Sequence, residues 1–591
     1  MNGSAVYQNG FHKSDELPKR QETWLDHWLE SNKNSIKLVI LVLIAVGAHV
    51  FVGFAIAHNF KKSVPAIVIL GLIYLYFIVK YGSTYLQRNF KHEIKKSTNA
   101  VSSLWGTTLW GYAVMQLAFF GLIIAAFIVW LIFDAHDSPI RIRSLAAIIM
   151  YLLIGFLLSA NPAKIKWRPV FGGIFLQFIV AFLVLRWETG NSSFRWASNQ
   201  VVKFLDYATN GTTFVYGFVA APPPICDFGS VFVYTSLQII IYFGAIVSVL
   251  YYLGIIQAVL SKVAWLVQNT VGTTAAESLN AAACIFLGQT EAALLIEPAL
   301  GTMTESEIHT VMTSGFACIA GSLFSAYISF GACPTYLLSA TVMSAAVSLS
   351  ISKLLYPEVQ KSRQIGSKNF KFAQREERNF LECISNGAVH ASSFIWAIAA
   401  NLIVYMALLT LANTTVAYFG DRLGYEDWSF NKFMGYCFFP LAYMMGASDA
   451  TDTATEMKET LHVAELMGMK TILNEFVAYQ ELMKMKADGR LMGHRAQMIA
   501  TYALCGFSNI SMIGSQIGIL SAMCPKRRAV FAKVALRGLI AGCISCFMTA
   551  SVAGVLVSQA ESCQATNQGS CYSLSNITET LAPFIQRNLF L

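Results

Sequence analysis

The sequence predicts an all-α polytopic membrane protein. Of its 591 residues, 55% are hydrophobic and only 13% are charged, which is about half the charged share of a soluble domain. The mean hydropathy is +0.53, and the apolar residues gather in long runs. A bilayer core of about 30 Å needs roughly 20 apolar residues in a helix, because hydrocarbon offers backbone polar groups no other partner. This composition argues against a soluble enzyme, a disordered scaffold and a disulfide-stapled secreted domain.

The apolar runs define about eleven transmembrane helices. The first three follow a polar segment, residues 1–35, which lacks the apolar core and cleavage site of a signal peptide. Two further stretches, 272–301 and 430–488, are apolar but interrupted by Gly, polar residues and acids. We predict transmembrane helices at about 36–60, 63–86, 103–133, 143–160, 169–187, 231–258, 307–331, 335–356, 390–415, 497–523 and 533–559.

Basic residues between these runs predict the orientation, because Lys and Arg favour the cytoplasmic side. With the tail 1–35 inside, the basic segments 88–96, 161–169, 357–387 and 526–528 all fall inside. Segments 188–226 and 560–591 then fall outside, where Asn191, Asn210 and Asn576 begin glycosylation sequons. We therefore expect a multi-pass plasma-membrane protein with a cytoplasmic N-terminus, a cytoplasmic connector at 357–387 and an extracellular C-terminal tail. Topology explains the net charge of +9 without a nucleic-acid partner.

The twelve cysteines indicate neither a metal centre nor a redox centre. Most lie inside apolar runs, where a free Cys behaves as a small hydrophobic residue. Cys543 and Cys546 form a CxxC pair inside the last predicted helix, but no second ligand pair accompanies them. Cys563 and Cys571 lie in the outer tail, and we expect a disulfide between them.

An internal repeat indicates a transporter. The segment Gly315–Ile319 (GFACI) resembles Gly506–Ile510 (GFSNI), and a Cys-Pro pair follows each Gly after 18 residues. An acid precedes each Gly inside an interrupted apolar stretch: Glu291 by 24 residues and Glu475 by 31. Lys-Arg-Arg follows only the second Cys-Pro pair, as expected if the two copies are inverted in the membrane. Chance recurrence in an apolar chain is the alternative.

Glu291 and Glu475 are the residues that most need a function. A carboxylate at mid-membrane depth costs at least about 2.5–3.5 kcal/mol, so it needs a partner, a proton or a water-filled cavity; a Glu at a helix end reaching the interface is the alternative. Uncharged hydrogen-bonding groups lie close in sequence to both acids, and no Lys or Arg lies within residues 288–292 or 473–477. This pattern favours a neutral polyhydroxyl ligand with a flat apolar part. The polar neighbours are Gln289, Thr290, Asn474, Asn509 and Ser511, and Phe507 is an aromatic candidate whose alternative role is ordinary packing.

Several motifs resemble those of the concentrative nucleoside transporters, in the animal branch of that family. They occur in order over about 143–560, and they include Gly288–Ala292 (GQTEA), Lys470–Tyr479 (KTILNEFVAY) and Cys505–Asn509 (CGFSN). The resemblance implies a homotrimer of cation-coupled nucleoside symporters. It also implies three extra N-terminal helices (36–133), scaffold helices (143–258) and two transport repeats (259–356 and 388–559). Each repeat would contain a re-entrant helical hairpin, at 272–301 and at 455–488.

The resemblance also implies the roles of individual residues. Gln289, Thr290 and Glu291 after Gly288 would face the nucleobase, with Leu323 beside it. Glu475 and Asn509 would bind ribose hydroxyls, with Phe507 near the ligand. A second ribose-contacting Ser of the family is Met512 here, although Ser511 is adjacent. The segment 447–459 departs from the family pattern.

The expected cation site departs from the family where an Asn and a Ser or Thr normally stand. Cys284 and Cys318 occupy these positions, with Leu287 and Ile319 nearby. A thiol is a poor ligand for a hard cation. We therefore expect proton coupling with Glu291 or Glu475 as the titrating group, because burial favours the neutral form of a carboxyl; sodium coupling through carbonyls and hydroxyls is the alternative.

Other classes of function fit the sequence less well. A channel or receptor would not need both acidic motifs, and a membrane enzyme would need a His or Cys placed beside Glu291 or Glu475. His309 and His390 lie near predicted helix ends instead. We expect neither an enzyme nor a bound cofactor; a transporter of another neutral solute, such as a sugar, is a further alternative.

Overall fold

The computed structural model describes residues 33–58, scattered positions from 70 to 136, and residues 138–560 except 221, 223–230, 364–376, 378, 425–427 and 492. The predicted helices 63–86 and 103–133 lie mostly outside the described residues, as do Asn576, Cys563 and Cys571. The chain forms two units, residues 1–127 and 128–591. In the first unit, helix α2 (Lys33–His58) covers the first predicted span.

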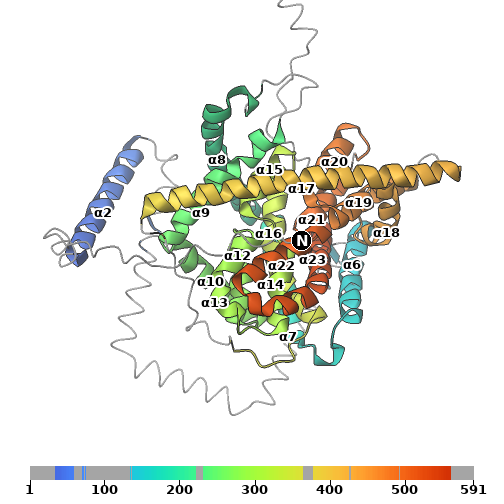
Figure 1. Cartoon of the computed structure of the whole chain (residues 1–591), viewed down its shortest axis with the longest axis horizontal. Helices are drawn as coiled ribbons and strands as arrows, with labels where there is room; N and C mark the ends of the chain where they lie inside the picture. The colour runs from blue at the N-terminus through green and yellow to red at the C-terminus, as the bar shows by residue number, and fades with distance from the viewer. Residues whose placement is uncertain are drawn as a thin grey trace, which may run out of the picture. The chain divides into compact units, whose positions relative to one another are not determined.

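The regular secondary structure of the described residues is entirely helical, with no strand among them, which confirms the all-α prediction. Among them, six helices are long and apolar enough to cross a membrane. The unit of residues 128–591 is shown in Figure 1. The six helices are α6 (Pro139–Leu157), α7 with its π-helical end (Trp167–Arg186), η4 with α9 (Val233–Tyr252), α16 (Pro334–Leu355), α17 (Phe380–Arg422), and η7 with α23 (Pro525–Leu556).

Two other predicted spans are broken helices. The span predicted at 307–331 consists of α14 (Glu305–Ala317), an extended link from Cys318, the short η5 (Gly321–Leu323) and α15 (Phe324–Ser329). The span predicted at 497–523 consists of α21 (His494–Leu504) and α22 (Ile510–Met523). Both breaks fall at the repeated motif that begins with Gly315 and Gly506.

Gly506 shows why the second break requires glycine. Its φ is +126°, a backbone conformation that side chains disfavour. A Cβ at this position would also lie 2.7 Å from Cys546 Sγ and 2.8 Å from the carbonyl oxygen of Ala317. The glycine therefore lets the broken helix approach both α23 and the break in α14.

Each broken helix is preceded by a pair of consecutive helices. The first pair is α11 (Ala275–Ala283) and α12 (Gln289–Leu295), followed by α13 (Glu297–Leu300). The second is α19 (Thr453–Ile472) and α20 (Glu475–Ala487). The side chain of Asn474 caps α20 by accepting a hydrogen bond from the Val477 amide at 2.9 Å. We refer to these pairs as hairpin 1 and hairpin 2.

Two segments differ from the sequence-based expectation. Residues 188–226, expected as a loop, contain the 29-residue helix α8 (Glu188–Tyr216) followed by η3 (Gly217–Val219); its low mean hydropathy concealed a surface helix. Asn191 and Asn210 both lie on α8; Asn210 is exposed, whereas Asn191 is half-buried and donates to the Val184 carbonyl at 3.0 Å. The interrupted stretch 430–488 contains a separate helix, α18 (Phe430–Met444), which packs against α19.

Hydrogen bonds between helix ends fix the relative directions of the helices. At one end, Arg141 of α6 donates to the Val555 carbonyl at 2.7 Å, and Arg495 of α21 donates to the Gly554 carbonyl at 2.9 Å. At the other end, Lys353 of α16 pairs with Glu277 of hairpin 1. Lys533, near the start of α23, pairs there with Glu305 at 2.9 Å. Helix α23 therefore crosses from the Glu305 end to the Arg141 end.

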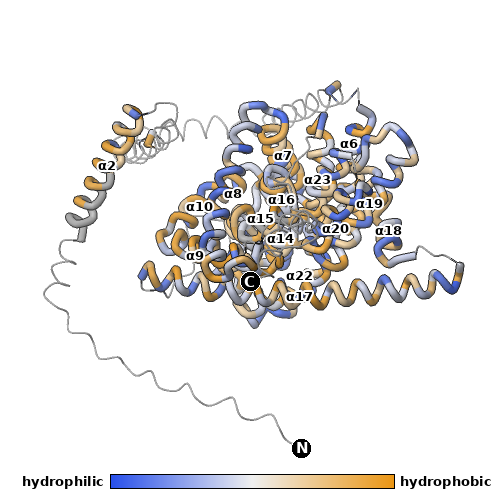
Figure 2. The backbone as a smooth tube through the Cα atoms, turned by 90° about the horizontal axis from the view of Figure 1, so that it is seen from above, coloured by the Kyte–Doolittle hydropathy of each residue, from blue (hydrophilic) through white to orange (hydrophobic). Residues whose placement is uncertain are grey.

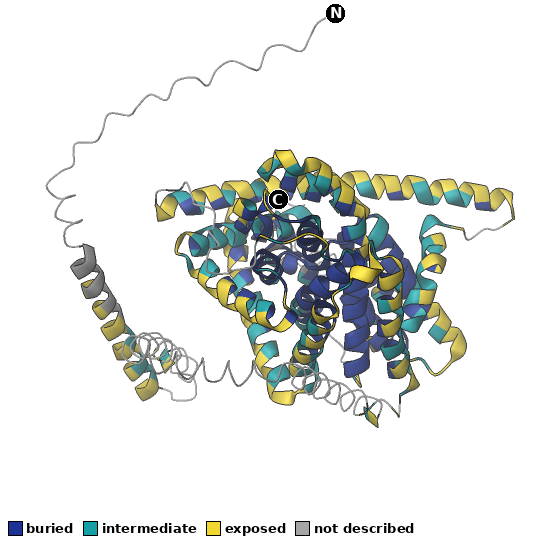
Figure 3. Cartoon of the chain, turned by 90° about the horizontal axis from the view of Figure 1, so that it is seen from below, coloured by how far each residue is buried: buried dark blue, intermediate teal, exposed yellow. Residues whose placement is uncertain are grey.

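Burial divides the helices into a core and a periphery. Helices α14, α16 and α23 pack against one another, and almost all of α14, most of α16 and residues 541–556 of α23 are buried. Figure 3 shows buried residues inside this unit and exposed residues on its outer helices. Helix α17 is 43 residues long and exposes apolar side chains along its length, with hydrophilic residues at its ends (Figure 2). Helix α10 (Ile255–Val271) links α9 to hairpin 1.

Candidate functional site

Glu475 lies at the junction of three elements. It begins α20 in hairpin 2 and is fully buried. Its Oε1 accepts a hydrogen bond from the Tyr327 hydroxyl of α15 at 3.2 Å, and its Oε2 accepts one from Asn509 Nδ2 at 2.8 Å. These two bonds join hairpin 2 to both broken helices and fix the direction of the carboxylate.

Asn509 holds the start of α22 as well as Glu475. Its Oδ1 accepts from the Met512 amide at 3.0 Å and from the Ser511 hydroxyl at 2.6 Å. Both ends of the amide side chain are therefore engaged, because its nitrogen donates to Glu475 while its oxygen caps the helix. Ser511 points back to Asn509, so the structure brings these two predicted residues together with Glu475.

Aromatic rings surround this carboxylate. The Tyr327 ring lies 5.1 Å from the Phe476 ring and 5.0 Å from the Tyr479 ring, between centroids. The Tyr479 hydroxyl donates to the Thr501 carbonyl at 2.9 Å. Phe507, in the break before α22, is 3% exposed. The hydrogen bonds of Glu475 are thus enclosed by apolar surface, where they are stronger than in water.

A buried cation anchors hairpin 2 to the second broken helix. Lys470 is fully buried near the end of α19. Its ammonium donates to the Ala503 carbonyl at 2.9 Å, close to the end of α21, where unpaired carbonyls favour a positive charge. Lys470 also interacts electrostatically with Glu475, so the acid is not an isolated buried charge.

Hairpin 1 presents its predicted residues from the start of α12. Gly288 is the N-cap of this helix, and Gln289, Thr290 and Glu291 are half-buried in its first turn. A Cβ at Gly288 would lie 2.5 Å from Glu291 Oε2, so the carboxylate folds back over the start of its own helix. Backbone N–H groups of Gly288 and Glu291 face it there. Gln289 Nε2 donates to Met512 Sδ at 3.4 Å, which places hairpin 1 against α22.

The residues expected to couple a cation lie between hairpin 1 and the break in α14. Cys284, Leu287, Cys318 and Ile319 are all buried. Asn280 Nδ2 donates to Cys284 Sγ at 3.9 Å, and Cys318 Sγ donates to the Thr341 carbonyl at 3.9 Å. Both sulfurs make weak contacts within the protein, and Cys284 also interacts electrostatically with Glu291.

Comparisons with known proteins identify the family of this chain. Family models match residues 146–219 (Na+ dependent nucleoside transporter N-terminus), 233–333 (nucleoside recognition) and 336–554 (Na+ dependent nucleoside transporter C-terminus). The sodium/nucleoside cotransporter 2 of Mus musculus is 38% identical over 542 residues, which cover 90% of this chain and 78% of that protein. The chain belongs to the concentrative nucleoside transporter family.

Further relatives extend the likeness to sequence and structure. The solute carrier family 28 member 3 of Eptatretus stoutii is 38% identical over 90% of this chain and 77% of its own length. A solved structure of CNTnw in an inward-facing substrate-bound state is 32% identical and covers 72% of this chain and all of that one, with a TM-score of 0.66. These comparisons confirm the family expected from the motifs, and they assign the chain to a family of membrane transporters, not of enzymes.

The structure shows three buried residues of this family member that the sequence analysis did not select as site residues. Tyr327 bonds to Glu475, Tyr479 packs on Tyr327, and Lys470 anchors hairpin 2. Lys470 and Tyr479 are the two ends of the motif KTILNEFVAY. A lysine in an apolar stretch could have been recognised from the sequence as a candidate site residue. Tyr327 has only serines as polar neighbours in its apolar run, so its sequence context carried no such signal.

The remaining predicted site residue is Leu323. Leu323 is 7% exposed at the start of α15, beside the break in α14.

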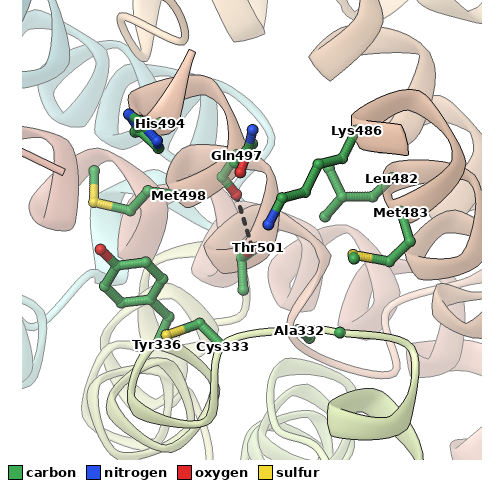
Figure 4. Close-up of a pocket in the computed structure, with 11 residues that line it drawn as sticks. Ala332, Cys333, Tyr336, Leu482, Met483, Lys486, His494, Gln497, Met498 and Thr501 are labelled. Carbon is green, nitrogen blue, oxygen red and sulfur yellow. Dashed lines mark hydrogen bonds between the residues drawn. The ribbon is translucent and has the colours of Figure 1, made fainter. Parts of the chain in front are cut away.

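A small cavity lies elsewhere, between α20, α21 and the segment 331–336, and it is lined in part by Tyr336, Lys486 and His494 (Figure 4). None of the predicted nucleoside-binding residues lines this cavity. Cys333 beside it is disulfide-bonded.

Proposed function

We propose that this protein is a secondary active symporter that imports purine or pyrimidine nucleosides, or both, with a cation. The bond between Glu475 and Asn509 carries the proposal, because it joins hairpin 2 to a broken helix beside hairpin 1. A buried carboxylate and a neighbouring amide suit vicinal ribose hydroxyls, since a carboxylate accepts hydrogen bonds strongly. Sodium/nucleoside cotransporters among the relatives support the same substrate class.

In this mechanism the two hairpins bind the two parts of one nucleoside. Glu475 accepts hydrogen bonds from the ribose, and Asn509, with Ser511 behind it, holds that acceptor in place. Gln289, Thr290 and Glu291, following Gly288, face the nucleobase, with Leu323 and Phe507 supplying apolar surface. A site shared between hairpins and broken helices suits alternating access, because rigid-body motion of these elements exposes it to either side in turn.

Uptake of radiolabelled uridine into cells that express the protein tests this function. We expect saturable uptake against a gradient, with competition by thymidine and by inosine. Glucose is the control solute, because it offers hydroxyls without a nucleobase. Competition by glucose, or an absence of concentrative uptake at confirmed surface expression, would count against a nucleoside symporter.

We further propose that protons are the main coupling ion. Thiols at Cys284 and Cys318 are poor ligands for sodium. Each already makes a weak hydrogen bond within the protein. Glu291 or Glu475 would carry the proton. The relatives are named sodium cotransporters, so sodium coupling is the competing hypothesis. Uridine uptake at acidic and alkaline pH, with sodium replaced by choline, separates the two: sodium dependence without a pH response contradicts proton coupling.

Orientation, location and assembly complete the proposal. We propose a homotrimer in the plasma membrane, with the Arg141 end of the helices outside and glycans at Asn191, Asn210 and Asn576. The disulfide at Cys333 supports this orientation, because stable disulfides are typical of the oxidising exterior. The exposed apolar surface of α17 suits contact with lipid and with two other copies. The mass of the purified protein in detergent, before and after deglycosylation, tests the trimer and the glycans together.

A further inference from the structure

Two buried amide oxygens near the proposed site have no hydrogen-bond partner in the described part of the chain. One is Oε1 of Gln516, a residue of α22 that is 1% exposed. The other is Oε1 of Gln289 at the start of α12, whose Nε2 donates to Met512. A buried oxygen without a partner costs free energy, so a native structure keeps one mainly where something else bonds to it.

The two glutamines converge on one point of α14. A Cβ at Gly315 would lie 2.3 Å from Gln516 Nε2 and 3.2 Å from Gln289 Cβ. Only a residue without a side chain leaves room there for the Gln516 amide. The first glycine of the repeated motif thus has a local role in this chain, which is to admit Gln516 beside Gln289.

The position of Gln516 on its helix places it in line with the site. Asn509, Met512 and Gln516 are spaced by three and four residues, so they share one face of α22. Asn509 holds Glu475 at the start of this face, and Met512 accepts from Gln289 one turn later. Gln516 follows by one further turn, on the side of hairpin 1.

Location distinguishes this pair from other unpartnered oxygens. Gln177 of α7 also has a buried Oε1 without a partner, but its Nε2 donates to Thr549 of α23 at 3.0 Å. That amide ties two core helices together. Gln516 instead lies against a residue that the proposed function assigns to the nucleobase.

We propose that Gln516 is a specificity-determining residue that binds the hydrogen-bonding edge of the nucleobase together with Gln289. This inference rests on the proposed function. Two acceptor oxygens select a base edge that carries an N–H donor, as adenine, cytosine and uracil do. A base without such a donor leaves both oxygens unpaired, and sites built to hydrogen-bond a substrate reject such analogues strongly.

Competition against uridine uptake by matched nucleosides tests the inference. Adenosine is compared with purine riboside and cytidine with pyrimidin-2-one riboside, because the second member of each pair lacks any N–H donor on its base. We expect the wild type to prefer the donor-bearing member by about tenfold, the effect of one hydrogen bond whose partner is left unpaired. Gln516→Met removes the amide at similar length and should lower this ratio several-fold. Gly315→Ala should do the same by displacing the amide.

Two controls separate a specificity role from a structural one. Gln177→Met removes a comparable buried amide outside the site and should leave the ratio unchanged. Gln516→Glu retains acceptor oxygens and should retain the preference, which matters if Gln516→Met fails to reach the surface. An unchanged ratio in Gln516→Met, or a wild type that does not discriminate, overturns the inference. A wild type that transports no nucleoside overturns the proposed function instead.

Discussion

The two hairpins hold their acids in different ways. In hairpin 2, Glu475 is fully buried and bonded to Tyr327 and Asn509, which belong to two other elements. In hairpin 1, Glu291 is half-buried, and its carboxylate folds back over the start of its own helix at Gly288. Tertiary contacts therefore fix Glu475, whereas local backbone groups hold Glu291.

The two acids therefore suit different roles in transport. A carboxylate fixed from two sides is preorganised to bind a ligand in one geometry, which suits a ribose. A carboxylate held only by its own helix can exchange partners at lower cost, which suits a change of protonation or ligand during transport. The repeats thus share an architecture but differ in the chemistry of their acids.

The largest effect on uptake should come from Glu475→Gln. The substitution keeps the shape but replaces charged hydrogen bonds with neutral ones, and bonds to charged groups are about twice as strong. We expect a loss of uridine uptake on the order of 100-fold. Uptake is measured at matched surface expression.

Glu481→Gln is the matched control for this variant. Glu481 lies on the same helix, α20, and pairs with Arg490 at 2.9 Å away from the site, so its loss should leave uptake nearly unchanged. Normal uptake by Glu475→Gln would remove the distinction between the two acids.

The second prediction concerns the base of hairpin 1. Lys353 of α16 is buried and pairs with Glu277 of α11, donates to Ser306 Oγ at 2.9 Å, and lies 3.4 Å from Glu358. Lys353→Met leaves buried carboxylates without their cation. Breaking a buried pair from one side costs about 3–5 kcal/mol, so we expect a clear loss of thermal stability in detergent.

A double variant separates the pair from the rest of the cluster. Adding Glu277→Gln to Lys353→Met removes the uncompensated charge and should restore part of the lost stability. Additive losses in the double variant would mean that the two residues act independently.

The sequence predicted the class and the interrupted segments of this protein better than it predicted individual contacts. Apolar length identifies spanning helices because lipid forces backbone bonds to close within a helix. Polar residues and glycines inside apolar stretches indicated both hairpins and the motif at Gly506, because an interrupted helix is tolerated at membrane depth only where protein or water satisfies its backbone groups. Helix α8 was mistaken for a loop because a surface helix needs only one apolar face, which leaves its mean hydropathy low.

The contacts of the site depend on packing between distant segments. Glu475 and Asn509 were selected separately, but nothing in the spacing of 34 residues required a bond between them. Tyr327 and Gln516 lie in apolar runs where their only polar neighbours are serines, so they form no pattern to detect. Their roles emerge only where the broken helices meet hairpins 1 and 2.

The third prediction compares Gly506, the second motif glycine, with a glycine of the adjacent helix α22. Gly506→Ala places a Cβ on a backbone with φ of +126° and within 2.7 Å of Cys546 Sγ. Backbone strain of this kind costs about 1–3 kcal/mol, so the variant should be less stable and less abundant. Gly514→Ala is the control, because a Cβ there on α22 meets nothing within 4 Å. Equal stability of the two variants would contradict a packing role for Gly506.

The subtlest effect should be a change of coupling ion in the double variant Cys284→Asn, Cys318→Ser. The substitutions replace two sulfurs near hairpin 1 with oxygen donors, which hard cations prefer. We expect uridine uptake at alkaline pH to become several-fold stimulated by sodium, while uptake at acidic pH changes little. The double variant Cys543→Ser, Cys505→Ser is the control, since these buried thiols belong to the second repeat and donate to the Ser508 and Leu337 carbonyls. Sodium stimulation in the first double variant alone would locate cation selection in hairpin 1, with ribose binding left to Glu475 in hairpin 2. Stimulation in both, or in neither, would mean that these thiols do not decide the coupling ion.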